Sequence, residues 1–456
     1  MLSVKKIVEI SNGSLYSGDE NLIVSNFSKD TRTLSEGDVY VGIKGEKFNG
    51  NVFWNEAFDK GAILCILEKD TVLDNVPEDK TIILVEDSVD ALQKIAKYHL
   101  KQKDPIVIAL TGSVGKTSTK EMIYSVLKQS YSILKTEGNY NNHIGLPLTI
   151  LKLSDEEVLL LEMGMNHAGE ISVLSKIAEP DIALVISIAD AHIGNLGSME
   201  NILKAKLEIV DGLKEDGTLI INNDNEYLHN AKINLPSIIK YGIKNDSDLK
   251  AIQVKFCEDY CNLKVRYENE EYEFNPKIIT EGFVYNALAS IMIGIKMDMS
   301  IENIKKGIEN FELVSGRLEK VETKKGINLI NDAYNANAES MKNALEYISN
   351  LTGNRRIAIL GNMLEQGDFD ERNHRQVGEY VTTNNIDYLI TIGDSAKFIN
   401  ESAIQNGMDE NKTKHFNANK DSFEFLKELL VSDDLVIVKA SNGEKFIEIV
   451  NFIKDM

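Results

Sequence analysis

The chain carries at residues 106–118 the sequence Ile106-Val107-Ile108-Ala109-Leu110-Thr111-Gly112-Ser113-Val114-Gly115-Lys116-Thr117-Ser118. Its apolar start predicts a buried strand over 106–110, and a helix is expected over 116–129 after the glycine-rich turn. Such a turn places backbone N–H groups and the positive end of a helix dipole around a phosphate. Lys116 is then expected to reach the outer phosphates and Thr117 to ligate Mg²⁺. Position 110 is Leu where the general pattern Gly-x4-Gly-Lys-[Ser/Thr] has Gly, yet the strand and helix around the turn favour nucleotide binding over a chance Gly-Lys-Thr.

The segments after this stretch alternate between strands and helices. Strands are expected over 158–163 and 182–188, with a helix over 169–178 between them. These strands are continuously apolar, which is typical of strands buried on both faces of a parallel sheet. Residues 250–275 alternate polar and apolar side chains instead, which predicts an antiparallel hairpin at the sheet edge. We therefore expect a doubly wound, mostly parallel α/β sheet in the central part of the chain.

Three domains are expected from the changes in pattern along the chain. Residues 1–86 alternate short strands with turns and predict a small α/β unit. Residues 87–314 begin with a helix, contain the parallel sheet with the phosphate-binding loop, and end in two further helices. A new α/β series predicts a third domain over 315–456. Its expected strands include residues 327–330, 357–360 and 435–438.

Two polar side chains follow strands of the central sheet. Glu162 comes at the end of the strand that starts at residue 158, and His192 follows the strand over 182–188. Ligands of open parallel sheets bind outside the carboxyl ends of the strands, so both point to the edge that carries the phosphate loop. Taken singly, each is more often a strand-end cap. Together with the loop they predict ligands of Mg²⁺ between phosphate oxygens.

The composition excludes several classes of function. The 456 residues include 50 Lys plus Arg and 71 Asp plus Glu, and the net charge of −21 repels nucleic acids and anionic lipid surfaces. Three cysteines are too few for a disulfide framework, and Cys257 and Cys261 lack the second Cys or His pair of a zinc site. The N-terminus has charges where a signal peptide needs an apolar core, and no run reaches the roughly 20 apolar residues of a membrane span. A cytoplasmic protein is expected, without nucleic acid or membrane insertion.

Further segments carry a resemblance to a known family. They are Lys135-Thr136-Glu137-Gly138-Asn139-Tyr140-Asn141-Asn142-His143-Ile144-Gly145-Leu146-Pro147, Glu162-Met163-Gly164-Met165-Asn166-His167-Ala168-Gly169-Glu170-Ile171, Asn331-Asp332-Ala333-Tyr334-Asn335-Ala336-Asn337, and Ser28-Lys29-Asp30-Thr31-Arg32 with residues 37–45. With the phosphate loop they resemble the Mur ligase family of peptidoglycan precursor synthesis, from about residue 28 to 448. The departure of the loop from the general pattern is the family's own form.

The resemblance implies an N-terminal domain for a UDP-sugar, a central ATPase, and a C-terminal Rossmann-like domain that closes on the nucleotide. The implied nucleotide contacts are Gly112, Ser113, Val114, Gly115, Lys116, Thr117, Ser118, Asn286, Arg317, Asp332, Asn335 and Asn337. The implied metal ligands are Thr117, Glu162, His192 and Lys206, and the implied substrate contacts are Ser28, Thr31, Arg32, Gly45, Asn141 and Asn142. Lys116, Lys206, His192 and Arg317 are implied to take part in catalysis. From the sequence alone, Asp332 and Asn337 fit helix N-caps equally well.

The activity that the resemblance implies is ATP-driven amide formation. The γ-phosphoryl group would activate a carboxylate as an acyl phosphate, and an amine would then displace phosphate. Residues 332–337 favour the addition of D-alanyl-D-alanine to a UDP-N-acetylmuramoyl-tripeptide, by a chain that is expected to be a monomer. A sister Mur ligase, a folylpolyglutamate synthase-like enzyme and a noncatalytic nucleotide-dependent scaffold remain alternatives. The third residue of the tripeptide, meso-diaminopimelate or lysine, is left open.

Several positions depart from the pattern of the family. Gly282 and Phe283 stand where His and Asn are usual, Asn51 replaces a His, Ala338 a Pro, Asn362 an Asp and Asn442 an Arg. They concern the first sugar-binding loop and the C-terminal domain. The phosphate loop and both metal-ligand candidates are intact.

Lys206 has two interpretations. By itself it is an ordinary solvated helix lysine, whereas the resemblance implies a lysine carbamylated by CO₂, whose oxygens would suit a hard cation. Lys204, two residues earlier, is expected on another face of the helix. ATP turnover is further expected to need domain closure around a hinge near residues 311–316, since Lys116 and Arg317 belong to different domains.

Overall fold

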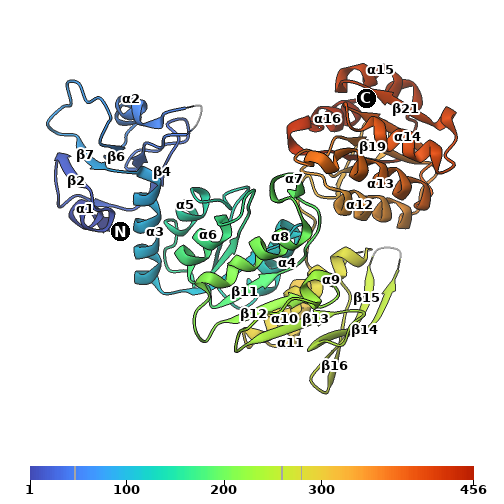
Figure 1. Ribbon diagram of the computed structural model, residues 1–456, viewed down its shortest axis with the longest axis horizontal. Helices are drawn as coiled ribbons and strands as arrows, with labels where there is room; N and C mark the ends of the chain where they lie inside the picture. Colours follow the sequence, from blue (N-terminus) through green and yellow to red (C-terminus); the bar gives the residue numbers. More distant parts are fainter. Residues whose placement is uncertain (46–47, 258–259, 279) are drawn as a thin grey trace.

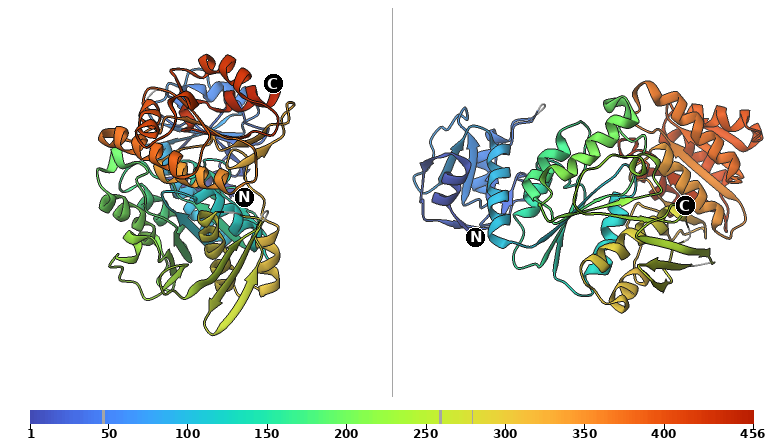
Figure 2. Two further views of the ribbon diagram at one scale, coloured as in Figure 1. Left: turned by 90° about the vertical axis from the view of Figure 1, so that its right-hand side faces the viewer. Right: turned by 60° about the horizontal axis from the view of Figure 1, so that its bottom comes forward.

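A computed structural model describes residues 1–45, 48–257, 260–278 and 280–456 of the chain. Three main β-sheets with their helices follow one another along the longest axis of the molecule (Figure 1). Figure 2 shows the N-terminal and C-terminal parts on opposite sides of the central part. The predicted α/β architecture of mostly parallel sheets is confirmed. The domain boundaries after residues 86 and 314 stay predictions.

The N-terminal sheet has the strand order β2-β7-β6-β5-β4. Strand β2 runs antiparallel to β7, and the other pairs are parallel. The strands are β2 (Ser14–Ser17), β4 (Phe27–Ser28), β5 (Val39–Val41), β6 (Leu64–Glu68) and β7 (Thr81–Val85), and β1 (Leu2–Ser3) pairs separately with β3 (Ile23–Val24). Helices α1 (Val4–Ser11) and α2 (Trp54–Asp59) pack beside β2 and β6.

The central sheet has nine strands in the order β16-β15-β14-β13-β12-β11-β8-β10-β9. Strand β8, which leads into the phosphate loop, pairs in parallel with β11 on one side and β10 on the other. The parallel strands are β8 (Ile106–Thr111), β9 (Ile133–Lys135), β10 (Val158–Glu162), β11 (Ile182–Val185), β12 (Thr218–Asn222), β13 (Ile238–Gly242) and the start of β14 (Leu249–Phe256). All residues of β10 and β11 are buried, as their continuous apolar sequences predict.

The edge of this sheet is antiparallel. Strand β14 pairs with β15 (Cys261–Tyr267), which pairs with β16 (Glu270–Phe274). The expected hairpin over 250–275 is therefore confirmed, and it contains a third strand. The alternation of buried and more exposed residues in β15 shows why this segment lies at an edge, with one face on the core.

Strand β11 is shorter than the sequence predicts. It ends at Val185, although the apolar run continues to Ile188. The backbone leaves the sheet because Ser187 bonds the phosphate loop: its carbonyl accepts from Ser113 N at 2.9 Å, and its hydroxyl accepts from Val114 N at 3.0 Å. An apolar run alone does not reveal this long-range contact.

Helices cover both faces of the central sheet (Figure 1). They are α4 (Lys116–Leu127), α5 (Gly145–Ile150), α6 (Glu170–Ala178), α7 (Ile193–Leu196), α8 (Met199–Leu207), α9 (Glu226–His229), α10 (Glu281–Lys296) and α11 (Ile301–Glu309). Helix α10 packs on α4, and both share one apolar core with the inner strands. Helix α4, which starts at the loop after β8, is thereby held in place by α10.

The C-terminal sheet has the order β17-β18-β22-β19-β20-β21, with β17 antiparallel and the others parallel. The strands are β17 (Glu319–Val321), β18 (Asn328–Asn331), β19 (Arg356–Gly361), β20 (Tyr388–Ile392), β21 (Thr413–Phe416) and β22 (Leu435–Lys439). The helices are α12 (Ala338–Asn350), α13 (Asp370–Thr383), α14 (Lys397–Gln405), α15 (Phe423–Leu429) and α16 (Ile447–Asp455). Two separate apolar cores lie on the two faces of this sheet.

Helix α3 (Ser88–Lys103) joins the N-terminal part to the central part. It packs on α1 on one side and on α5 and α6 on the other. Asp87 caps its first turn by accepting from Val89 N and Asp90 N. Among the described residues, no helix combines the length and the apolar character needed to cross a membrane.

The contact between α11 and α4 predicts a sensitive position. A Cβ atom at Gly307 would lie 2.4 Å from the Cα of Val126, a backbone atom that cannot move aside. We expect Gly307→Ala to lower stability by about 1–3 kcal/mol through overpacking. The loss would appear as a lower melting temperature in thermal unfolding, measured with and without a nucleotide. Lys306→Ala, at an exposed neighbouring position, is the control, and equal melting of both variants would contradict the prediction.

Candidate functional site

The loop between β8 and α4 is preformed. Gly115 is the residue before the first turn of α4 and has φ of +86°, a conformation that favours glycine. A Cβ atom at Gly112 would lie 2.3 Å from Ile186 Cγ1, so the loop also needs glycine there for close packing. Ser113 donates its hydroxyl to the carbonyl of Ala189 at 2.9 Å. The loop therefore has its shape before any ligand is bound.

Polar contacts link this loop to β10 and to the C-terminal domain. Thr117 Oγ1 donates to Glu162 Oε2 at 3.0 Å and accepts from Arg317 Nη2 at 2.8 Å. Glu162 Oε1 accepts from Asn141 Nδ2 at 2.9 Å. The structure thus brings together four of the residues that the sequence analysis proposed, from four separate segments.

Lys116 lies at the centre of this group. Its Nζ donates to the carbonyl of Gly112 at 2.8 Å, so it lies curled over the loop. Burial lowers the pKa of Lys116; Glu162 opposes this shift, and the positive charge of Arg317 adds to it. Neither Lys116 nor Arg317 forms an ion pair within the described ranges, and a phosphate in the loop would supply the anionic partner.

Sequence analysis missed a second lysine in this region. Lys120, one turn after Lys116, is 1% exposed. Its Nζ lies 3.2 Å from Glu121 and 3.9 Å from Glu162, and it donates to the carbonyl of Thr136. The sequence could have indicated Lys120 as a residue of this region, because its spacing of four residues from Lys116 puts both lysines on the same face of α4.

A cavity of about 840 Å³ opens beside the loop, between the central and C-terminal domains. At one end it is cationic, with Lys116 and Arg317. The rest of its charged lining is mostly acidic, with Asp224, Glu226, Glu281, Glu339 and Glu346 beside the lysines Lys244 and Lys342. Burial, followed by the charge of Glu281, raises the pKa of Glu346. This distribution suits a ligand with phosphates at one end and hydroxyl or amino donors at the other.

Asp224 anchors the second end of the cavity. It accepts from the backbone N–H groups of Ile243, Lys244 and Asn245 and from the Tyr285 hydroxyl at 3.1 Å. Burial raises the pKa of Asp224, but these hydrogen bonds outweigh it and the net shift is downward. Nearby, Tyr241 lines the cavity, and its buried hydroxyl has no partner within the described ranges. A bound ligand would satisfy such a group.

Asn286 lies between these two ends. Its Oδ1 accepts from the Thr119 hydroxyl at 2.9 Å, and the residue lines the cavity on α10. Gly282 and Phe283, two of the departures from the family pattern, line the same wall. Phe283 also packs on Phe311, at 6.4 Å between ring centroids, and touches the cores of both neighbouring domains.

The C-terminal wall of the cavity contains Asp332, Asn335 and Asn337. Asp332 accepts from Lys439 Nζ at 2.7 Å, and Lys439 also donates to the carbonyl of Asn335 at 2.9 Å. Asn337 is the N-cap of α12, in a capping box with Ser340. The capping role and a position in the cavity wall therefore coexist in Asn337. The sequence did not predict Lys439 as a residue of the cavity wall, although its position at the end of the parallel strand β22 could have indicated it.

His192 lies apart from the other proposed metal ligands. In the described part of the chain, no hydrogen bond or ion pair joins it to Thr117 or Glu162, and it does not line the cavity. Its Nδ1 lies 2.6 Å from Glu365 Oε2, on the C-terminal domain. The hydrogen bond from His192 lowers the pKa of Glu365.

Lys206 is buried, which argues against a solvated helix lysine. It is 1% exposed on α8, whereas Lys204 is exposed, so the two lie on different faces as expected. No polar partner of Lys206 is present among the residues that the structure describes. Burial, and then the positive charge of Lys116, hold its pKa well below the usual value. Burial thus disfavours the charged form of this amine, which lies close enough to Lys116 to be affected by its charge.

The proposed substrate contacts divide between two places. Ser28, Thr31, Arg32 and Gly45 lie in the N-terminal domain, away from the cavity lining. Arg32 pairs with Asp30 at 2.6 Å and holds the pKa of that carboxyl at about 2. Asn141 contacts Glu162 as described, while Asn142 Oδ1 accepts at 2.8 Å from the N–H of Gly145, the first residue of α5.

The remaining departures have simple structural roles. Asn362 Oδ1 accepts from Ser395 N and Ala396 N, which an Asp oxygen would also do. Asn51 Oδ1 accepts from Glu68 N at 2.9 Å. Ala338 is the first residue of α12, and Asn442 is the first residue of a short 3₁₀ helix. Asn362 thus keeps its acceptor without the charge.

The oxygen donors at the loop fit Mg²⁺. A carboxylate and a hydroxyl, Glu162 and Thr117, lie 3.0 Å apart beside the phosphate loop, and such oxygens are the ligands that Mg²⁺ prefers with phosphate. No group of three or more His, Cys, Asp and Glu side chains within the described residues forms a complete metal site. Phosphate oxygens would therefore have to complete the coordination.

Comparison with known proteins identifies the family. The Mur ligase catalytic domain matches residues 24–99, the Mur ligase middle domain residues 110–294, and the Mur ligase glutamate ligase domain residues 316–442. The UDP-N-acetylmuramoyl-tripeptide–D-alanyl-D-alanine ligase of Bacillus subtilis (strain 168) is 38% identical over 451 residues, covering 98% of this chain and 97% of the relative.

Solved structures agree with this result. The MurF ligase from Thermotoga maritima, in complex with ADP, is 28% identical with a TM-score of 0.82, covering 94% of this chain and 97% of that chain. MurF from Acinetobacter baumannii has a TM-score of 0.87 at 24% identity, covering 99% and 98%, and supports the fold. The resemblance found in the sequence is confirmed.

The ion pair of Lys439 and Asp332 yields a stability prediction. Lys439→Met leaves Asp332, which is 8% exposed, without its cation, and should cost about 3–5 kcal/mol. The double variant with Asp332→Leu should recover part of the loss. Amide hydrogen exchange in β18 and β22 measures the stability of this domain. Lys427→Met, at an exposed site of the same domain, is the control, and additive losses in the double variant would contradict the prediction.

Proposed function

Since the chain belongs to the Mur ligase family, we propose that it is the ATP-dependent ligase that joins D-alanyl-D-alanine to a UDP-N-acetylmuramoyl-tripeptide in peptidoglycan precursor synthesis. The observation that carries this proposal is the cavity between two domains, in which the phosphate loop and Arg317 meet at the Thr117 hydroxyl. Relatives that are similar along the whole chain support the choice among sister ligases.

The reaction has two steps. An oxygen of the terminal carboxylate of the tripeptide attacks the γ-phosphorus of ATP, which forms an acyl phosphate and releases ADP. The amine of D-alanyl-D-alanine then attacks the acyl carbon, an amide bond forms, inorganic phosphate leaves, and the amine loses a proton. Activation is needed because a carboxylate is a poor electrophile at neutral pH.

The residues of the chain mainly position and stabilise charge. The loop N–H groups and the start of α4 hold the phosphates, while Lys116 and Arg317 balance the charge that develops during transfer. Glu162 and Thr117 would hold Mg²⁺, which supplies further positive charge to the phosphate oxygens when bound. His192 is proposed as a further metal ligand, and this role requires it to share its ring with the contact to Glu365.

Other parts of the proposal concern the remaining domains and the cell. The N-terminal domain binds the UDP end of the substrate through Ser28, Thr31, Arg32 and Gly45. Domain closure near residues 311–316 brings Arg317 to the loop, and Asp332, Asn335 and Asn337 to the nucleotide. The chain is proposed to work as a monomer in the cytoplasm. Its three free cysteines suit a reducing compartment.

Substrate dependence is the direct test of the function. Phosphate release from ATP should require both a UDP-muramoyl-tripeptide and D-alanyl-D-alanine, because the acyl phosphate turns over only when an amine is present. Assays with lysine and with meso-diaminopimelate tripeptides would identify the third residue. Turnover with one free amino acid in place of the dipeptide would indicate a sister ligase, and indifference to both substrates a scaffold.

Lys116→Ala should separate chemistry from binding. We expect phosphoryl transfer to fall by about 100-fold or more, because a cation on the transferring phosphate is lost. Binding of the UDP substrate should change far less, since the proposed contacts of its uridine end lie in the N-terminal domain. Single-turnover rates and calorimetry measure the two quantities. Equal losses in both would mean that Lys116 is structural.

Lys206 is proposed to be carbamylated. Its lowered pKa favours the neutral amine, which would add to CO₂ with loss of a proton and give an anionic oxygen ligand near the loop. We expect Lys206→Ala to lose most activity, Lys204→Ala to keep it, and removal of bicarbonate to slow the unmodified enzyme. Full activity of Lys206→Arg, which forms no comparable carbamate, would refute the modification.

A further inference from the structure

The C-terminal domain contacts the central domain at a second place, away from the cavity. The loop over residues 362–367, which follows β19, packs against α7 of the central domain. Gly194 lies so close that a Cβ atom on it would be 2.7 Å from Gly367 N and 2.8 Å from the carbonyl oxygen of Glu365. The two backbones are therefore in direct contact, and a glycine at position 194 permits it.

One side-chain contact crosses the same junction. His192 Nδ1 and Glu365 Oε2 lie 2.6 Å apart, although the residues are 173 positions apart in sequence. Both residues have left-handed backbone conformations, with φ of +61° and +63°. Such conformations are uncommon for residues with a side chain and persist when the surroundings hold them. Both partners are therefore presented by backbones of fixed shape.

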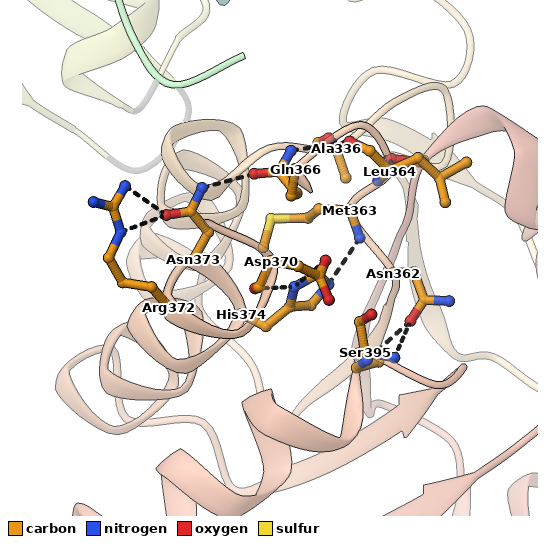
Figure 3. A network of polar contacts seen from close by, with 12 residues as sticks. Ala336, Asn362, Met363, Leu364, Gln366, Asp370, Arg372, Asn373, His374 and Ser395 are labelled. Atoms are coloured by element: carbon orange, nitrogen blue, oxygen red, sulfur yellow. Dashed lines mark hydrogen bonds and ion pairs between the residues drawn. The ribbon is translucent and has the colours of Figure 1, made fainter. Parts of the chain in front are cut away.

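A buried network makes the loop rigid (Figure 3). Met363 N donates to His374 Nε2 at 3.0 Å, and Asn373 Nδ2 donates to Gln366 Oε1 at 2.7 Å. His374 and Asn373 are both 0% exposed on α13. Glu365 lies between Met363 and Gln366, so this network holds the backbone that presents it. In the placement of the two domains seen here, its side chain reaches His192 across the junction.

The second contact and the cavity contact occur together in this structure. Arg317 reaches Thr117 at 2.8 Å on one side, and Glu365 reaches His192 on the other. Two contacts at separate places fix the orientation of a domain better than one.

We infer that Glu365 is a positioning residue that, with the Gly194–Gly367 contact, holds the C-terminal domain in the closed placement in which Arg317 reaches Thr117. The inference rests on the proposed function only for its effect on turnover. The contact itself is a property of the chain and is measured without any substrate.

Two variants act on the junction in different ways. Glu365→Ala removes the side chain, which is 48% exposed, so the fold should survive. Gly194→Ala leaves Glu365 in place but puts a methyl group where Gly367 packs. Gly194 does not have a positive φ, so alanine favours α7 itself, and any loosening comes from the domain contact. Glu371→Ala removes an exposed carboxylate of α13 that pairs with Arg375, and it is the matched control.

The measurements are amide hydrogen exchange in α7 and in residues 362–367, the radius of gyration of the free protein, and steady-state kinetics. We expect Glu365→Ala and Gly194→Ala to speed exchange at both segments and to increase the radius of gyration. KM for ATP should rise on the order of 10-fold, with a smaller change in kcat, because bound substrates still drive closure. Glu365→Gln keeps an acceptor oxygen for His192, so its exchange rates and radius of gyration should lie between those of Glu365→Ala and those of the wild type.

Unchanged exchange and an unchanged radius of gyration in both variants would overturn the inference, whatever happens to turnover. A loss of kcat at constant KM with normal exchange would also overturn it, since it would place Glu365 in the chemistry. If the wild-type chain failed to turn over the proposed substrates, the proposed function would be wrong, but the exchange data would still show whether Glu365 holds the two domains together. The two proposals can therefore fail separately.

Discussion

The Thr117 hydroxyl is the group on which the geometry of the whole site depends. It has one proton to donate and lone pairs to accept with, and it uses them on Glu162 and Arg317. The first partner ends a strand of the central sheet, and the second belongs to the C-terminal domain. A small shift of any of the three breaks at least one bond. The phosphate loop, the strand-end carboxylate and the position of the third domain are thus set together.

Electrostatics explains how an acidic chain handles an acidic substrate. With a net charge of −21 the molecule repels polyanions at long range. Close to the loop, however, the cations Lys116 and Arg317 form no ion pair with a carboxylate of the described residues, while Lys439 is neutralised by Asp332. The carboxylates at the other end of the cavity favour the uncharged part of a nucleotide. The charge pattern therefore gives the ligand one preferred direction.

The sequence predicted those features that depend on local pattern. Strand β8, the loop and α4 form one continuous signal, and the polar residue Glu162 at the end of a parallel strand falls beside them for topological reasons. It did not predict the end of β11 at Val185, the pairing of His192 with Glu365, or the burial of Lys206, for which the residues alone favoured a solvated side chain. Each of these depends on contacts between distant segments. Hydrophobic periodicity contains no information about such contacts.

Helix α3 has a consequence for how long a substrate must be. It lies between the sheet with the proposed uridine contacts and the central sheet, with its axis across the longest axis of the molecule (Figure 1), so one layer of helix separates the two parts. A molecule held by its nucleotide in the first domain presents its far end to the cavity only if the intervening sugar and peptide have the right extent. Under the proposed function, the separation of the two sites makes the length of the substrate a criterion of selection besides its chemistry. A peptide one residue shorter would bind at one end and leave its carboxylate short of the phosphate.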